Sequence, residues 1–319
     1  MPRAIEGVAG LQAQLPTAPY VGLWTRLEGF ERSKLQRALE RRRVVKATLM
    51  RMTLHLTSAE DYLLLGGALK EHLTEFYERR LARSGLDVDA VAVARRAVAA
   101  SARGPRTRAE LLDGVPADPW LVWGLVRTRA DLVHTPDSAA WKLTYGRNSF
   151  VSARSFLGRP VDTSPLATEH LVRRHLAAFG PATRADLAQW SGLTVGRMRP
   201  ALESLKLRRF RDERGRELLD FPRAPLPDAD TPAPARFLPQ WDSVLLAHDD
   251  RSRVLDPALR RRVIMGNGDV LPTFLVDGFV AGLWRFEQGR VLLEPFRRLP
   301  RAMRAELEEE AERLAAFIA

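Results

Sequence analysis

Apolar and polar positions along the chain follow a helical period in some segments and a strand period in others. The clearest example is residues 164–221, which begin with a helix in TEHLVRRHLAAFG, preceded by Ser164 and Pro165 and ended by Gly180. TRADLAQWSG and TVGRMRPALESL predict two more helices, although the proline in the second must kink it or shift its start. LRRFRDERGRELLDF then predicts strand, turn and strand. Three helices followed by a hairpin is the order of a winged helix, whose second and third helices usually meet DNA.

Two earlier segments repeat this order of elements. The helices predicted there are 18–27, 32–42, 58–81, 88–101, 107–113 and 119–127. VVKATLM and MTLHLTS predict the first pair of strands, and DLVHTPDSAAWKLTYG predicts strand, loop and strand for the second. Only PRAIEGVA stands where the first helix of the first copy belongs, so we expect that helix to be truncated.

The pattern changes after residue 222. PRAPLPDADTPAPAR predicts a stiff proline-rich linker, and short strands with the turn signals Asp277-Gly278 and Gln288-Gly289 then favour a small barrel or curled sheet. RAMRAELEEEAERLAAFIA predicts a terminal amphipathic helix.

The whole pattern predicts an α+β protein with five parts. We expect winged helices at 1–82, 83–160 and 161–222, a linker at 223–236, and a β-barrel with the terminal helix at 237–319. Three winged helices are more than a regulator of one site needs, and they suggest a surface that wraps a long piece of duplex.

Composition narrows the classes of function. Lys and Arg exceed Asp and Glu by 50 − 39 = 11, and the pI of about 10.7 makes nucleic acid the first candidate partner, although an arginine bias can also reflect genome composition and solubility. The chain has no cysteine, and its six histidines lack metal-ligand spacing, so we expect no metal. No apolar run is long enough for a bilayer and the N-terminus lacks a signal-peptide pattern, which predicts a cytoplasmic protein without a membrane partner.

Two amides stand in apolar surroundings in GLQAQLPTAPYVGLWT. Pro16 disfavours a helical conformation for Leu15, so the segment is expected to be extended, with Gln12 and Gln14 pointing the same way. Such a pair can hold a water molecule or bind a polar edge. The alternative is that both amides tie a loop to neighbouring backbone, as most buried polar side chains do.

Several segments together resemble a known family. They are GLQAQ, PYVGLW, RRRVVKATLMRMTLHLTSAEDY, LPQWDSVLLAHDDRSRVL and GNGDVLPTFLVDGFVAGLW. Over roughly residues 5–290 the chain resembles the AlkZ/YcaQ-type winged-helix DNA glycosylases. The resemblance implies three winged helices around a C-terminal β-barrel, in a C shape that accepts duplex DNA. It also implies removal of bulky or crosslinking N7-alkylated purines, including unhooking of interstrand crosslinks.

The same resemblance assigns a catalytic role to the two glutamines. The family signature is Gln–apolar–Gln in one branch and Gln–apolar–Asp in the other, and Gln12-Ala13-Gln14 is similar to the first, which is associated with self-resistance to genotoxic natural products. Glutamine cannot take up a proton at neutral pH. A purine alkylated at N7 is already cationic and leaves as a neutral base, so the enzyme only has to place a water molecule near C1′ and offset the charge on the sugar. We therefore expect strict preference for cationic lesions, with no cofactor.

The strands after the glutamines contain further candidates for DNA contact. Lys46, Arg51 and His55 lie in VVKATLMRMTLHL. Arg51 and His55 share one strand parity only if both strands continue without a break, and the turn expected near Met50–Met52 spoils this count; both could face a DNA groove near the glutamines. His55 is the candidate here for titration near neutral pH, although a lone strand histidine is more often a structural hydrogen-bonding residue.

The C-terminal part contains the remaining candidates. Arg251 and Arg253 would point the same way in an extended segment and could clamp phosphates; the alternative is a salt-bridge cluster with the aspartates Asp242, Asp249 and Asp250. Trp284 and Arg285 lie on a predicted hairpin that could wedge into the duplex, although such aromatics more often fill a barrel interior.

The leading hypothesis is a monomeric, monofunctional DNA glycosylase acting on double-stranded DNA with alkylated purines, in the nucleoid. One rival is a non-catalytic winged-helix regulator, which needs a dimer with spaced recognition helices and leaves the glutamine pair unexplained. Another is a protein that binds damaged DNA without cutting it.

Overall fold

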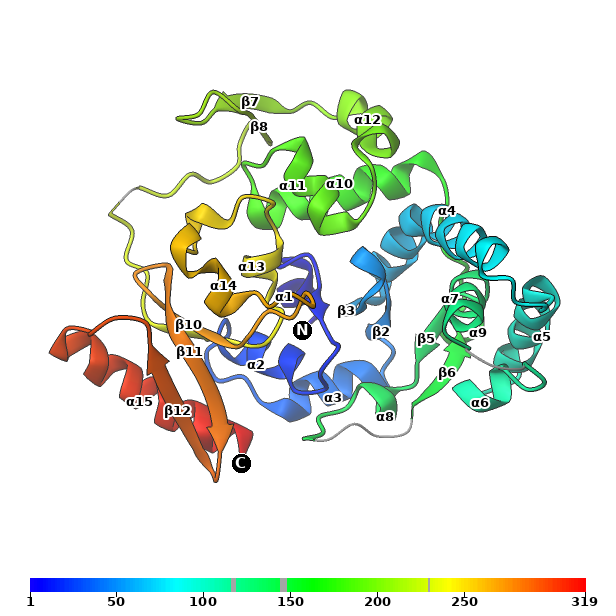
Figure 1. Cartoon of the computed structure of the whole chain (residues 1–319), viewed down its shortest axis with the longest axis horizontal. Coiled ribbons are helices and arrows are strands. Elements are labelled where there is room, and N and C mark those ends of the chain that lie inside the picture. The colour runs from blue at the N-terminus through cyan, green and yellow to red at the C-terminus, as the bar shows by residue number, and fades with distance from the viewer. Residues whose placement is uncertain (116–118, 144–147, 229) are drawn as a thin grey trace.

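The computed structural model describes residues 1–115, 119–143, 148–228 and 230–319, and its helices and strands are mixed along the chain (Figure 1). The helices are α1 Pro2–Glu6, α2 Ala18–Trp24, α3 Arg32–Glu40, α4 Ala59–Ser84, α5 Ala90–Ala102, α6 Arg108–Leu111, α7 Pro119–Arg129, α8 Pro136–Ala139, α9 Ala153–Leu157, α10 Pro165–Phe179, α11 Arg184–Ser191, α12 Val195–Ser204, α13 Ser243–Leu246, α14 Arg260–Val263 and α15 Arg301–Ile318. The 3₁₀ turns are η1 Met50–Met52, η2 Arg251–Arg253 and η3 Pro257–Leu259. The strands are β1 Leu11–Gln12, β2 Val44–Thr48, β3 Leu54–Ser58, β4 Arg106–Thr107, β5 Leu132–His134, β6 Ser149–Ser152, β7 Arg208–Arg211, β8 Glu217–Asp220, β9 Arg236–Leu238, β10 Thr273–Val276, β11 Phe279–Glu287 and β12 Arg290–Pro295.

A six-stranded sheet in the order β1-β3-β2-β5-β6-β4 joins the two N-terminal parts of the chain. Its strand pairs are antiparallel, and the joint between the parts is the pairing of Ala47 in β2 with Val133 in β5. The segments 1–82 and 83–160, predicted as two units, therefore share one sheet. The second strand expected within 131–146 is not found at residues 140–143, and residues 144–147 lie outside the described residues. The predicted loop contains α8, and the strand that pairs with β5 is β6, which begins at Ser149.

Residues 164–221 contain the predicted order of three helices and a hairpin, α10, α11, α12, β7 and β8. Thr183 caps α11 through a capping box with Asp186, and Thr194 caps α12 by accepting a hydrogen bond from the backbone N–H of Arg197. Of the two effects expected of Pro200, a kink or a shifted start, the shifted start is not observed: α12 begins after Thr194 and continues through the proline to Ser204.

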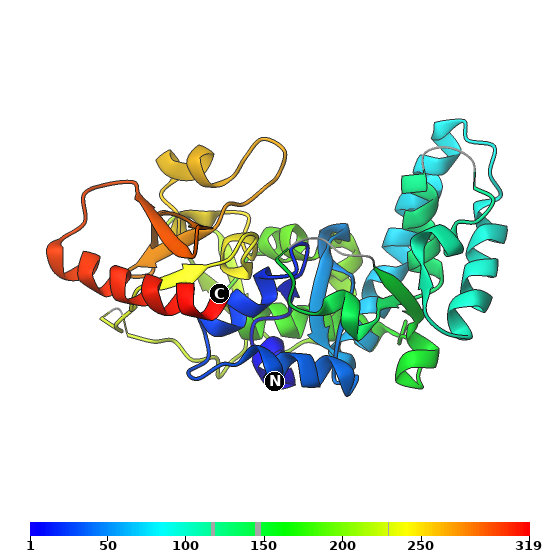
Figure 2. The same cartoon turned by 90° about the horizontal axis from the view of Figure 1, so that it is seen from below.

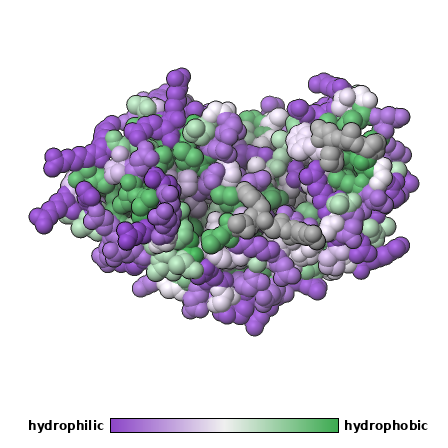
Figure 3. Space-filling model, turned by 60° about the horizontal axis from the view of Figure 1, so that its bottom comes forward, coloured by the Kyte–Doolittle hydropathy of each residue, from purple (hydrophilic) through white to green (hydrophobic). Residues whose placement is uncertain are grey.

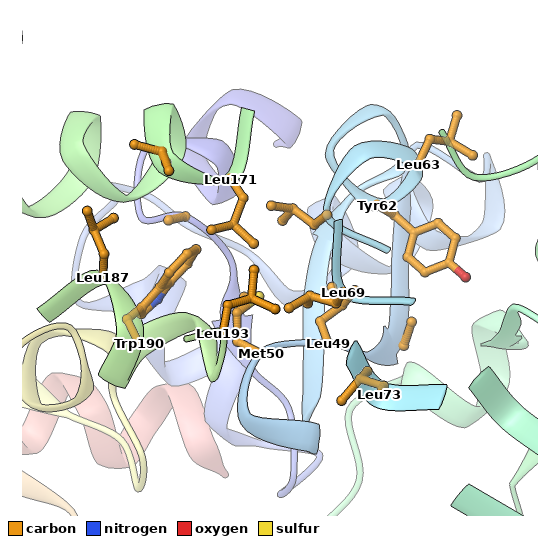
Figure 4. Packing of buried hydrophobic residues seen from close by; sticks show 14 of the residues in the cluster. Leu49, Met50, Tyr62, Leu63, Leu69, Leu73, Leu171, Leu187, Trp190 and Leu193 are labelled. Atoms are coloured by element: carbon orange, nitrogen blue, oxygen red, sulfur yellow. The ribbon is translucent and has the colours of Figure 1, made fainter. Parts of the chain in front are cut away.

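The largest core lies between the first sheet, α4 and these three helices. Leu171, Leu187, Trp190 and Leu193 meet Leu49, Met50, Leu69 and Leu73 there (Figure 4). The helices expected to face DNA therefore direct one side into the protein, toward the turn that follows β2.

The C-terminal part forms an open sheet in the order β12-β11-β10-β9. Its two hairpins turn at Asp277-Gly278 and Gln288-Gly289, where all four residues have positive φ, as the sequence predicted. The predicted barrel is not confirmed, since no closed barrel is found among the described residues and β9 and β12 remain the edges of the sheet. Helix α15 packs beside β9 and β12, and their shared core includes Phe237, Phe274, Trp284, Leu307 and Leu314.

Two arms rise on the same side of the molecule in Figure 2, one built from α4, α5 and α7 and the other from α14 and β10–β12. The N-terminal segment, dark blue at the middle of Figure 1, lies between them. Hydrophilic side chains cover most of the face in Figure 3, in keeping with the charged composition.

Candidate active site around Gln12

The Gln12-Ala13-Gln14 segment lies along the edge of the first sheet. Gln12 pairs with His55 of β3, and the Ala13 N–H donates to the Leu54 carbonyl oxygen at 2.7 Å. Gln12 is buried, with 7% of its surface exposed, whereas Gln14 is exposed. The Gln14 Oε1 accepts the Leu54 N–H at 3.3 Å, so this amide extends the strand pairing by one more hydrogen bond.

Arg51 holds the amide of Gln12. Its Nη2 donates to Gln12 Oε1 at 3.0 Å, and its Nη1 donates to the carbonyl oxygen of Trp190 in α11. Burial, with the nearby charge of Arg251 as a smaller cause, lowers the pKa of Arg51 to about 10, so its guanidinium stays charged at neutral pH. Both predicted catalytic amides therefore make hydrogen bonds with groups in or just after the turn between β2 and β3.

His55 stands opposite Gln12 in the strand pairing but is sealed inside the protein. It is 2% exposed, and its Nδ1 lies 3.1 Å from the carbonyl oxygen of Thr53. Burial, and secondarily the charge of Arg51, lowers the pKa of His55 to about 3. The expectation that His55 titrates near neutral pH is therefore wrong, and its imidazole is neutral under physiological conditions.

Comparison with known proteins identifies the family of this chain and a solved structure with the same fold. The family model described as DNA glycosylase AlkZ-like matches residues 5–317. The chain belongs to the AlkZ-like DNA glycosylase family. A Streptomyces sahachiroi protein named interstrand DNA cross-link repair glycosylase is 26% identical over 335 residues, which cover 97% of this chain and 88% of that protein. The solved structure of Streptomyces sahachiroi DNA glycosylase AlkZ matches with a TM-score of 0.77 at 21% identity, over 99% of this chain and 89% of the other, which shows a shared fold.

Two arginines of the C-terminal part lie in the 3₁₀ turn η2, so the predicted extended segment is wrong. Arg251 donates through Nε to the Leu245 carbonyl oxygen at 2.7 Å, and Arg253 donates through Nη1 to the Pro181 carbonyl oxygen at 2.8 Å. Neither forms an ion pair within the described residues, and the same holds for Arg51. This AlkZ-like protein thus keeps three arginines on neutral partners.

The alternative prediction for this run, a salt-bridge cluster, is also wrong in its partners. The buried carboxylate of Asp242 accepts two hydrogen bonds from Arg26, at 2.7 and 2.9 Å, and a third from the Val244 N–H. Asp250 forms ion pairs with Arg214 and Arg216 at 2.9 and 3.0 Å. These aspartates therefore neutralise arginines other than Arg251 and Arg253.

Lys46 on β2, another predicted DNA contact, is buried, with 4% of its surface exposed. His55 pairs with Gln12 on one side and with Ala47 on the other, so these three side chains share a face of the sheet. Lys46 is the neighbour of Ala47 on β2, so its side chain lies on the opposite face from Gln12. Burial, and then the charge of Lys142, lowers the pKa of Lys46 to about 8. A side chain enclosed in this way offers no surface to a phosphate.

Trp284 fills the C-terminal core and cannot wedge into a duplex. It is 8% exposed, its Nε1 donates to the Leu238 carbonyl oxygen at 2.8 Å, and its ring meets Phe237 edge-on. The alternative prediction placed such an aromatic inside a barrel; Trp284 is indeed buried, but in the core between the open sheet and α15. Arg285 points the other way and is exposed, with an ion pair to Glu287 at 3.1 Å.

Sequence reasoning missed the contribution of the third helical part to the site. The Trp190 carbonyl oxygen and Gly192, which follows α11, both contact Arg51. The end of α11 can be recognised from the sequence, because Gly192 follows it. The contact of this helix end with the turn that contains Arg51, 139 positions before Trp190, cannot. In the part of the chain that the structure describes, no cluster of potential metal ligands is found, and no helix has the length and apolar character to span a membrane.

Proposed function

We propose that this protein is a monofunctional DNA glycosylase that hydrolyses the N-glycosidic bond of cationic N7-alkylated purines in double-stranded DNA. Bulky adducts and interstrand crosslinks are included, as the name of the Streptomyces sahachiroi relative suggests. The observation that carries the proposal is the amide of Gln12, held by a charged arginine and beside a histidine that is neutral at physiological pH.

This arrangement suits a leaving base that is already cationic. When the bond between C1′ and N9 breaks, its electron pair neutralises the purine, so no acid has to protonate the base. Water then bonds to C1′ and releases its proton to solvent. A carbonyl oxygen has two lone pairs, so Gln12 Oε1 and Gln14 Oε1 can each accept a hydrogen bond from that water beside their present donors. Positioning and electrostatics are all that the amides need to supply.

The charges around the site support DNA as the substrate. Arg251 and Arg253 donate to backbone carbonyl oxygens and form no ion pair within the described residues. An arginine that is not ion-paired to a carboxylate keeps its charge available for a DNA phosphate. We further infer a monomer whose three winged-helix parts and C-terminal part form a C-shaped surface around a duplex at the nucleoid.

The decisive experiment measures base release from a duplex that carries one 7-methylguanine, by alkaline cleavage of the abasic product. The wild type should yield strand breaks, and Gln12→Ala and Gln14→Ala should each lower the single-turnover rate by about 100-fold, the usual cost of removing one group that stabilises a transition state. Gln36→Ala is the matched control, because Gln36 is a half-buried amide whose Nε2 donates to Glu40 on the same helix, α3.

Two outcomes would contradict the proposal. One is the absence of breaks with the wild type, together with tight binding to one undamaged sequence, as a regulator would show. The other is efficient release of uracil or undamaged purines, since a site without an acid should act only on cationic bases.

A further inference from the structure

The turn between β2 and β3 presents Arg51 in an unusual backbone conformation. Arg51 and the next residue, Met52, have φ of 52° and 62°, in the left-handed region that side chains other than glycine rarely adopt. Backbone hydrogen bonds from Leu49 to Thr53, from Met52 to Leu49 and from Thr53 to Met50 hold this turn at 3.0 to 3.1 Å. A left-handed conformation at a non-glycine residue costs free energy, and it persists only where the surrounding structure imposes it.

The C-terminus of α11 completes the surroundings of Arg51. The last carbonyl groups of a helix lack partners inside the helix and carry its negative dipole end. Arg51 Nη1 donates to one of them, the carbonyl oxygen of Trp190, while Nη2 donates to Gln12 Oε1. One planar guanidinium therefore bridges the third helical part and the predicted catalytic amide.

Gly192 allows this close approach. It follows α11 with a φ of +83°, and a Cβ placed on it would lie 3.2 Å from the Arg51 nitrogen and 3.3 Å from its Cα. Trp190 itself is anchored in the core and is 2% exposed. Arg51 is thus held by its own turn, by α11 and by contact with Gly192.

We propose that Arg51 is a positioning residue, which with Trp190 and Gly192 sets the orientation of the Gln12 amide for base excision. The sequence made Arg51 a candidate for DNA contact, but both of its terminal nitrogens donate inside the protein. A free glutamine amide can rotate and exchange its oxygen and nitrogen ends. The guanidinium donates to Oε1 and would repel the Nε2 hydrogens, so it selects the rotamer of the Gln12 amide in which Oε1 faces Arg51. This inference rests on the proposed function, because excision is the reaction that it serves.

The first test replaces Arg51 and separates positioning from DNA binding. Arg51→Met should lower the single-turnover release of 7-methylguanine by about 100-fold, the cost of a misplaced catalytic group. Its Kd for a duplex with an unreactive tetrahydrofuran abasic analogue, and the salt dependence of that Kd, should match the wild type. Arg51→Lys should stay impaired, since an ammonium keeps the charge but not the planar fork that reaches both acceptors.

A matched arginine serves as the control. Arg42 also has positive φ, 56°, and donates to the carbonyl oxygen of Phe156, in a remote segment, at 3.1 Å. Arg42→Met should leave excision unchanged, whereas equal losses in both variants would reduce Arg51 to a structural residue and overturn the inference.

The second test moves Arg51 without removing it. Gly192→Ala should lower excision by about 10-fold at unchanged Kd, because its methyl group presses on the Arg51 backbone. Gly158→Ala is the control, since Gly158 also follows a helix in the left-handed region, with φ +76°, but has no neighbour within 4 Å of an added Cβ. Thermal unfolding of each variant shows that folded protein is compared.

The outcomes separate this inference from the proposed function. If the wild type releases no base, the proposed function fails. The orientation of Gln12 is then measured by NMR of ¹⁵N-labelled glutamine amides, assigned by comparison with Gln12→Ala. The Gln12 amide signal should shift in Arg51→Met and Gly192→Ala but not in Arg42→Met, and an unchanged signal overturns the inference.

If the wild type is active and Arg51→Met is equally active, the inference fails while the proposed function stands. A weaker Kd with a salt slope reduced by about 0.9 would instead identify a phosphate contact.

Discussion

At the scale of single residues, burial decides whether His55, opposite Gln12, and His175, against Trp190, can exchange a proton. His55 stands opposite Gln12, and burial lowers its pKa to about 3. His175, whose ring packs on that of Trp190, has its pKa lowered to about 4, also by burial. A group whose native pKa lies this low is almost entirely neutral at every pH above 5.

The excision rate should therefore be flat with pH across the usual range of histidine titration. Between pH 5.5 and 8.5 the single-turnover rate on a 7-methylguanine duplex should vary by less than about 2-fold, since His55 and His175 stay neutral throughout. His55→Gln would change the level of the rate but not its dependence on pH. A sigmoidal profile with a midpoint near 6.5 that disappears in His55→Gln would show that the histidine does titrate in the reaction.

The sequence led to the glutamine pair but not to the residue that holds it. Pro16 and Gly10 indicate an extended segment, and the family signature draws attention to Gln12 and Gln14. Arg51 stood out only as a cation, because its left-handed backbone conformation lacks the glycine that usually marks one. Its bond to the Trp190 carbonyl oxygen joins residues 139 positions apart, a distance that local patterns do not span.

At the scale of elements, local signals predicted the longer helices, missed short ones such as α8, α9, α13 and α14, and predicted strand pairing poorly. Helix starts have short-range causes, such as the capping box at Thr183 and the hydrogen bond from the Asp61 N–H to Ser58 Oγ at the start of α4. The pairing of Ala47 with Val133 has no such local cause, so the shared six-stranded sheet was not predicted. The open C-terminal sheet has the same explanation, since hairpin turns are local and closure of a barrel depends on its two most distant strands.

Two elements far apart in the chain depend on one ion pair. Arg26, just after α2, bonds both carboxylate oxygens of Asp242 before α13, and the Asp242 side chain is 0% exposed. Asp242→Asn should destabilise the protein by about 3 kcal/mol, the typical cost of breaking a buried pair on one side, because it leaves the Arg26 charge without its partner. Urea unfolding measures this loss.

The same variant also tests whether Asp242 acts as a catalytic acid, a role that the sequence alone allows for this aspartate. The folded fraction of Asp242→Asn should excise 7-methylguanine at the wild-type rate. A large fall in rate without a fall in stability would assign Asp242 to the reaction instead.

At the scale of the whole molecule, the distribution of ion pairs matters more than the net charge of +11. Many arginines are already neutralised, as Arg214 is by Asp250 at 2.9 Å. Arg251 and Arg253 differ, because carbonyl oxygens are their hydrogen-bonding partners and no carboxylate pairs with them in the described ranges. Burial lowers the pKa of Arg251, as does the charge of Arg260, while the charge of Asp249 acts in the opposite direction without forming an ion pair.

This difference predicts which arginines contact a bound duplex. Arg251→Ala and Arg253→Ala should each reduce the slope of log K against log salt by about 0.9, because each removes one phosphate contact and the counterion that it releases. Arg214→Ala removes the same formal charge from an exposed position, but that charge is already paired, so the slope should hardly change. Fluorescence anisotropy on a 20-base-pair duplex from 50 to 300 mM NaCl measures all three slopes. Equal changes in the three variants would mean that only total charge governs binding, and that Arg251 and Arg253 form no defined phosphate site.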